Sequence, residues 1–391
     1  MKNKIKIASY VSFWSLIIGI MVGGYLTLVN WCIDAVWKHA KLGLPWAGKV
    51  FVICLTGGLI IGLLNKFLGD YPLTIAEVLT QTRQEGHLDY HNWWKSFVLG
   101  LTVLASGGSV GPEASATVLT ASMINWVGDR WRLAHFTDHF KLWTGSLKKE
   151  KLSALPRFHE MFASKRQQKL ITTLLTLVGV VGLAIVLKIF PEEGVFGIHL
   201  RQIDWAWSSC WAILPALMVG FVFGWLFVKS GSLFAKIIQP NWSPIIKAVV
   251  FGLLLACAGL FSQDALFSGE FRIVPFAKEA MFLPPLYLIC VAFIKLITTN
   301  FGFFMGWRGG TIFPAIFSSA AIGSALALIM PGSFQVTAAI VLSVSVTVIL
   351  RRPLLTAILL ILLVSIYLAP LVLVTCYLTA WIMKKFPILQ P

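Results

Sequence analysis

Two short motifs rich in glycine and proline carry the clearest chemistry in this sequence. The first reads GGSVGP at residues 107–112, and the second reads GGTIFP at residues 309–314. In both, two glycines precede a hydroxyl residue, a β-branched aliphatic residue, one further residue and a proline. Proline is tolerated in the first turn of a helix, and glycines before it allow the backbone to turn sharply. Each motif therefore predicts a break in the chain followed by the start of a helix.

A helix start can bind an anion without any charged side chain. Its first four N–H groups have no partner within the helix, and the helix dipole adds about half a positive charge there. Partial charges allow an anion to enter and leave, whereas a full lysine charge would hold it too tightly to conduct. We expect the anion-binding groups to come from both motifs: Ser109, Val110, Gly111, Gly310, Thr311, Ile312 and Phe313. The residues expected to break the helices are Gly107, Gly108, Pro112, Gly309 and Pro314.

The composition places these motifs in a membrane protein. The 391 residues are 58% hydrophobic and only 12% charged, whereas soluble domains carry about a quarter charged residues. This excludes disordered chains, coiled coils, nucleic-acid factors and secreted disulfide scaffolds. Apolar segments that could span a membrane lie at 9–31, 49–65, 170–190, 206–229, 245–262, 281–305, 310–330, 334–350 and 354–382. The last is interrupted at Pro370, which predicts two helices or one kinked helix.

Residues 95–126 have the pattern of a broken helix, because two short apolar segments flank the first motif. Broken helices in both halves of a chain indicate a transport site near the middle of the membrane. We therefore expect an all-α, polytopic integral membrane protein with repeated, broken (re-entrant) helices. The first membrane repeat is predicted at 1–169, the second at 170–391, and no separate soluble domain is expected.

The formal net charge of +16 reports membrane orientation more than cargo. Much of it belongs to the termini and to a basic segment at 129–169, where aromatic residues are interleaved. This mixture is typical of amphipathic helices on an anionic cytoplasmic leaflet. We expect both termini in the cytoplasm and the protein in a bacterial-type plasma (inner) membrane.

The remaining ionisable residues give weaker signals. Asp264, Glu270 and Glu279 fall in one connection and predict a solvated surface, and no acidic residue follows Glu279. Lys295 lies within an apolar stretch, where it either snorkels or raises the local anion concentration at a pore mouth.

Two histidine pairs, His87 with His91 and His135 with His139, are spaced i and i+4 and could grip a metal on a helix. No third ligand follows from their spacing. No metal or cofactor is therefore expected, and the chain is not expected to be an enzyme.

Residues 106–113 and 308–314 resemble two anion-selectivity motifs of the CLC chloride channel/transporter family, and residues 350–356 resemble its later Arg-x-Pro-Leu-Thr stretch. The resemblance implies a homodimer of inverted-repeat subunits, each with its own anion pathway. It also implies that the backbone amides of Ser109, Val110 and Gly111, and of Thr311, Ile312 and Phe313, line that pathway.

The sequence departs from the family pattern in several places. Val110 stands at the position of the family's gating glutamate, and the nearby titratable residue is Glu113, a carboxylate at a helix start. The family's early Gly-Ser-Gly-x-Pro motif is not recognisable near residues 69–73, and no counterpart of its C-terminal anion-binding tyrosine is found. The basic segment replaces two apolar helices.

Together these features predict passive or weakly coupled transport of small inorganic anions, chloride foremost. The expected partners are the anion, membrane lipid and a second copy of the chain, without nucleic acid. Two alternatives stay open: a non-conducting membrane scaffold, and a metal-dependent membrane enzyme that uses the His-x-x-x-His pairs.

Overall fold

A computed structural model describes most of the chain: residues 2–39, 43–85, 88–136, 158–162, 164–191, 203, 206–238 and 242–386. Over these residues the regular structure is helical, apart from one antiparallel bridge between Gly111 and Gly310. The predicted all-α class is confirmed. Most of the basic segment, His87 and His139 lie outside the described residues.

Eight helices among the described residues are long and apolar enough to cross a membrane. The helices that carry these spans are α1 (Lys2–Asp34), α2 (Trp46–Leu68), α7 (Lys165–Ile189), α8 (Cys210–Ile237), α9 (Pro244–Phe261), α11 (Pro285–Phe304), α12 (Ile312–Ile329) and α15 (Ala369–Lys385). The other α-helices are α3 (Ile75–Glu85), α4 (Trp93–Ala105), α5 (Glu113–Phe136), α10 (Ile273–Glu279), α13 (Phe334–Leu350) and α14 (Pro353–Leu363).

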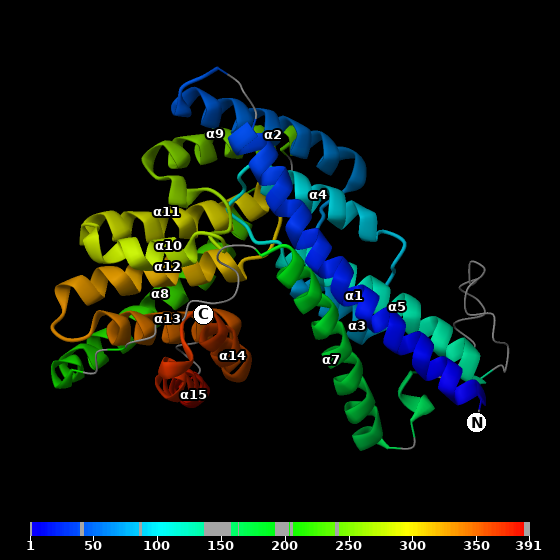
Figure 1. Ribbon diagram of the computed structural model, residues 1–391. Coiled ribbons are helices and arrows are strands. Elements are labelled where there is room, and N and C mark those ends of the chain that lie inside the picture. The colour runs from blue at the N-terminus through cyan, green and yellow to red at the C-terminus, as the bar shows by residue number, and fades with distance from the viewer. Residues whose placement is uncertain are drawn as a thin grey trace. The chain divides into compact units, whose positions relative to one another are not determined.

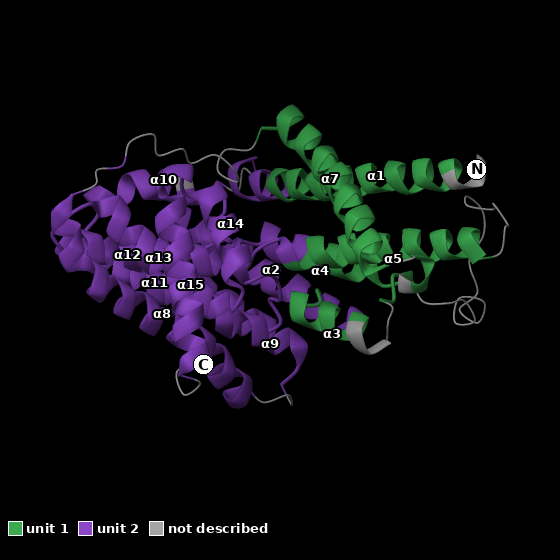
Figure 2. Ribbon diagram, turned by 90° about the horizontal axis from the view of Figure 1, so that it is seen from below, with its two compact units in different colours: residues 1–31, 72–98, 114–191 green, residues 32–71, 99–113, 192–391 purple. Residues whose placement is uncertain are grey.

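The helices form two compact units whose chain segments interleave (Figure 2). Unit 1 contains residues 1–31, 72–98 and 114–191, and unit 2 contains residues 32–71, 99–113 and 192–391. The predicted repeat boundary at residue 169 stays a prediction, because these units are defined by compactness and not by internal repetition.

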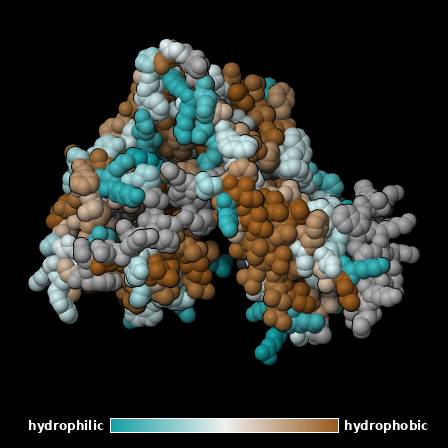
Figure 3. Space-filling model, in the orientation of Figure 1, coloured by the Kyte–Doolittle hydropathy of each residue, from teal (hydrophilic) through white to brown (hydrophobic). Residues whose placement is uncertain are grey.

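In unit 1, α1 and α7 pack with their backbones in close contact. A Cβ atom on Gly19 would lie 1.8 Å from the carbonyl oxygen of Gly179, so only glycine fits there. Small residues permit this approach between membrane helices. The outward face of α7 is apolar and visible as a continuous hydrophobic area in Figure 3, with Leu174, Leu177 and Val181 each more than half exposed. A face of this kind suits a lipid environment.

In unit 2, α12 packs against both α11 and α13 (Figure 1). Buried hydroxyl and amide groups join these helices to their neighbours. Ser319 and Ser345 pair at 2.8 Å between α12 and α13, and Asn300 of α11 donates to the carbonyl of Phe227 on α8 at 2.8 Å. Because polar side chains in a membrane protein need internal partners, these bonds fix the helices that carry the second motif.

The apolar run that contains Pro370 forms two helices. Helix α14 ends at Leu363, and α15 begins at Ala369 with Pro370 in its first turn. Proline cannot donate the hydrogen bond that a continuous helix requires, and the run forms two helices, one of the two outcomes that the sequence allowed.

Candidate anion-binding site

The two glycine-proline motifs lie side by side within unit 2. Helix α5 begins at Glu113, directly after Pro112, and α12 begins at Ile312, with Pro314 in its first turn. Both predicted helix starts are therefore confirmed. The Gly111 N–H donates to the Gly310 carbonyl at 2.7 Å, and the Gly310 N–H donates back to the Gly111 carbonyl at 2.8 Å. This reciprocal pair fixes the start of α12 against the first motif.

Several amides that the sequence assigns to anion binding have partners inside the motifs. The N–H groups of Gly111 and Gly310 form the bridge, and the Val110 N–H donates to the Gly108 carbonyl at 2.8 Å. Ser109 is buried, and its hydroxyl lies 3.2 Å from the Thr299 hydroxyl. The role of these groups in binding an anion stays a prediction.

The start of α12 is occupied by the carboxylate of Glu113. Its Oε1 accepts the Ile312 N–H at 2.6 Å, and the Phe313 amide is a further partner. The residue as a whole is half-buried, but Oε2 is shielded from solvent and has no hydrogen-bond partner among the described residues. Thr311, at the N-cap of α12, provides no side-chain cap. A carboxylate that directly follows the first motif therefore stands where a helix start favours negative charge.

Two glycines leave room for this carboxylate. A Cβ atom on Gly310 would lie 2.0 Å from Glu113 Cδ, and one on Gly111 would lie 1.8 Å from Glu113 Oε2. Neither position can carry a side chain while the carboxylate stays in place. Both glycines can be recognised from their motif in the sequence, whereas their contact with Glu113 arises only in the folded chain.

Val110 presents no titratable group to the site. Its side chain is 1% exposed, and a Cβ atom on Gly309 would lie 2.4 Å from Val110 Cγ2. The valine therefore packs against the backbone of the second motif. The carboxylate of Glu113 accepts a hydrogen bond from the start of α12 instead.

The prediction that residues 264–279 form a solvated acidic surface is wrong for two of the three residues. Asp264 is 8% exposed and Glu270 is 2% exposed, whereas Glu279 lies at the surface. Arg272 joins both ends of this segment, because it donates to Asp264 Oδ1 at 2.9 Å and to Glu279 Oε1 at 3.0 Å. The charge of Asp264 indicated exposure, but a carboxylate that is paired with an arginine can be buried.

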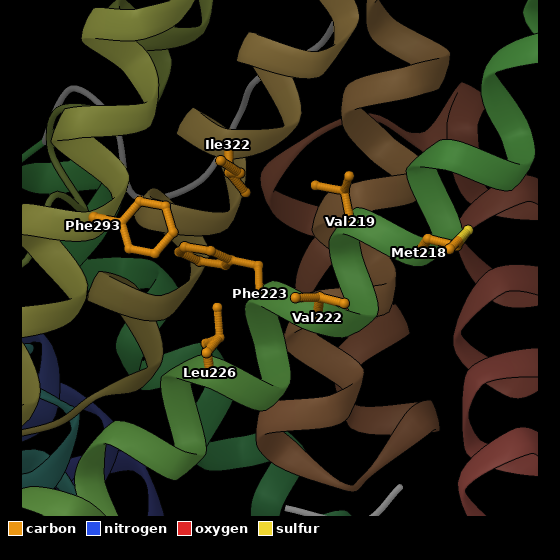
Figure 4. A pocket seen from close by; sticks show the side chains of 7 residues that line it. All are labelled: Met218, Val219, Val222, Phe223, Leu226, Phe293 and Ile322. Atoms are coloured by element: carbon orange, nitrogen blue, oxygen red, sulfur yellow. The ribbon is translucent and has the colours of Figure 1, made fainter.

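Other candidate sites receive little support from the described residues. Within the described ranges, no three His, Cys, Asp or Glu side chains are grouped so that they could hold a metal. A pocket of about 300 Å³ lies between α8, α11 and α12, but its walls are apolar side chains such as Phe223, Phe293 and Ile322 (Figure 4). It offers no side-chain hydrogen-bond donor to an inorganic anion.

The chain is similar in sequence to a known protein family. A sequence profile described as "Voltage gated chloride channel" matches residues 158–384, which include the whole second motif. The chain belongs to this family. The chain is thus an integral membrane protein, and its functional class is anion transport. The first motif, at residues 107–112, lies outside the matched residues.

Solved structures of the family share the fold. A slow cyanobacterial Cl⁻/H⁺ antiporter is 17% identical, with a TM-score of 0.67, over 97% of this chain and 94% of that chain. A CLC-type fluoride/proton antiporter is 16% identical, with a TM-score of 0.64, over 98% of both chains. No curated protein matches the sequence.

Proposed function

We propose that the protein moves small inorganic anions, chloride among them, across its membrane by passive or weakly coupled transport. The anion binds at the start of α12, where the Ile312 and Phe313 amides face the site. The supporting observation is the Glu113 carboxylate on the Ile312 N–H at 2.6 Å. The Glu113 carboxyl group thus occupies an amide that an anion would use, at a helix start where negative charge is favoured.

Glu113 acts in this proposal as a tethered competitor. While it is ionised, it holds the amides that a transported anion needs, and the anion binds when the carboxylate leaves. Protonation removes the charge of Glu113 and with it the attraction to the positive end of α12. The anion then has no ionised competitor, so flux is expected to rise as the pH falls.

Weak coupling to protons is expected because position 110 carries a valine and not a titratable residue. The residue before Gly111-Pro112 carries no proton that could be exchanged for an anion. A chloride gradient is therefore expected to drive little or no uphill proton movement. The expected homodimer, the bacterial-type inner membrane and the cytoplasmic termini remain further predictions that accompany this proposal.

Chloride efflux from proteoliposomes tests the role of Glu113. The Glu113→Gln variant removes the charge and nearly preserves the volume of the side chain. At neutral pH we expect chloride efflux about tenfold faster than in the wild type, equivalent to about 1.4 kcal/mol. We also expect efflux by this variant to lose its dependence on pH, because the competitor no longer titrates. A pH electrode in the same vesicle suspension measures proton movement.

Glu160→Gln serves as the matched control, because Glu160 is an exposed carboxylate outside the site. It should leave both the rate and its pH dependence unchanged. If Glu113→Gln behaves like this control, Glu113 does not compete with the anion. Absence of efflux from every variant and from the wild type would instead favour a non-conducting scaffold.

A further inference from the structure

Building on the function proposed above, we propose that Lys295 and Thr299 of α11 are positioning residues that hold the first motif in register with the second. Lys295 would then support the anion site through the backbone, and its charge would not attract the transported anion. The two side chains are four residues apart and therefore lie on one face of the helix. Both are 0% exposed.

The hydrogen bonds of Lys295 account for all of its donors. A lysine ammonium has three N–H groups and no acceptor. Its Nζ donates to the carbonyls of Asp264 at 3.0 Å, Leu266 at 2.8 Å and Phe267 at 2.5 Å. The ring of Phe317 lies 5.2 Å from the same ammonium and adds a cation–π contact. No N–H is left for an anion, so the ammonium serves the segment that it binds.

That segment reaches the first motif directly. Phe267 adopts a φ of 57°, which residues other than glycine rarely adopt, so its backbone must be held by its surroundings. Its carbonyl accepts from Lys295, and its N–H donates to the Gly107 carbonyl at 2.9 Å. One residue thus transmits the position of the ammonium to the start of the first motif.

Thr299 holds the same motif two residues further along. Its hydroxyl donates to the Ser109 carbonyl at 2.9 Å. The first motif is therefore fixed at Gly107 through Lys295 and at Ser109 through Thr299. Because α11 ends at Phe304, shortly before the second motif, one helix sets the position of both motifs. Release of either support is expected to displace Glu113 and the Gly111–Gly310 bridge relative to Ile312.

Two variants test this arrangement, and both leave the site's own residues unchanged. Lys295→Met keeps an apolar stem of similar length but removes the ammonium, and Thr299→Val keeps the shape of the side chain but removes the hydroxyl. Lys278→Met is the matched control, because it makes the same change at an exposed lysine of α10. Hydrogen exchange in residues 105–111 reports the position of the motif, and chloride-dependent efflux reports the site.

We expect hydrogen exchange in residues 105–111 to accelerate about tenfold in both variants. The half-saturating chloride concentration should also rise about tenfold, while the maximal efflux rate changes less than about twofold. The control should show neither change. Unchanged exchange at residues 105–111 in Thr299→Val, or in folded Lys295→Met, would overturn the proposal. A second pattern would also overturn it: the half-saturating chloride concentration rises in Lys295→Met but not in Thr299→Val, and the rise disappears at high salt. That pattern would indicate that the charge of Lys295 attracts the anion directly.

The two readouts separate this inference from the function on which it builds. Hydrogen exchange measures the hold on the first motif whether or not anions pass. If the wild type shows no efflux but both variants still loosen residues 105–111, positioning is supported and the proposed transport function fails. If efflux occurs and exchange is unchanged in both variants, transport stands and the positioning role fails.

Discussion

At the scale of single residues, the site depends on how closely Glu113 approaches two glycines. The carboxyl carbon lies where a side chain on Gly310 would begin, and Oε2 lies where one on Gly111 would begin. Packed atoms cannot share this space, so a methyl group at either position must displace the carboxylate. The fit of Glu113 against Gly310 can therefore be measured as a coupling energy.

We expect Gly310→Ala to destabilise the wild-type protein by about 1–3 kcal/mol, the typical cost of overpacking. In a Glu113→Ala background the same change should cost much less, because the three atoms nearest to the added Cβ all belong to Glu113. Thermal unfolding of the four proteins in one detergent gives the double-mutant cycle. Gly128→Ala is a control, since a Cβ there meets nothing within 4 Å. An equal cost in both backgrounds would place Glu113 away from Gly310.

At the scale of helices, α8 supports the second motif through its packing with α13. Gly220 and Gly224 lie one turn apart on α8, and Cβ atoms on them would lie 2.8 Å from the Val341 carbonyl and 2.6 Å from the Ser345 carbonyl. Ser345 in turn pairs with Ser319 of α12 at 2.8 Å. The close approach of α8 and α13 thus extends to the helix that begins at the site.

A bulky side chain at Gly224 should force these helices apart. We expect Gly224→Leu to lower the melting temperature of the protein and to reduce its free energy of unfolding by at least about 1–3 kcal/mol. Gly24→Leu, on the exposed side of α1 where a Cβ meets nothing within 4 Å, should have little effect. Equal melting temperatures for the two variants would show that close contact between α8 and α13 does not contribute to stability.

The helices themselves could largely be predicted from the sequence. Long apolar runs located the spans, Pro370 located the division between α14 and α15, and the glycine-proline motifs located the starts of α5 and α12. These features are local, because a helix start or a break is decided within a few residues. The resemblance in residues 308–314 also led to the correct family.

The contacts between distant residues could not be predicted in this way. Glu113 was assigned to the start of its own helix, whereas its carboxylate reaches Ile312, 199 residues later. No spacing rule connects those positions, because the Gly111–Gly310 bridge arises only in the folded chain. The burial of Asp264 could not be predicted either. It depends on contacts that form only in the folded chain, with Arg272 through the carboxylate and with Lys295 through the carbonyl.

At the scale of the whole molecule, the net charge of +16 is not what defines the site. The groups that face the proposed anion are backbone amides at one helix start, and the nearest charged side chain in contact with them is an acid. The lysine and arginine residues of the termini and of residues 129–169 are expected to set membrane orientation by the positive-inside rule. Anion binding is therefore expected at one defined position and not wherever positive charge accumulates.

Anomalous X-ray scattering from bromide tests this claim most directly, because it locates every bound bromide in the molecule. Crystals of Glu113→Gln grown with bromide should show a peak within hydrogen-bond distance of the Ile312 amide nitrogen, and wild-type crystals at neutral pH should show a weaker peak there. Bromide bound only at lysine and arginine side chains in both proteins, with the Ile312 amide unoccupied, would contradict the proposal.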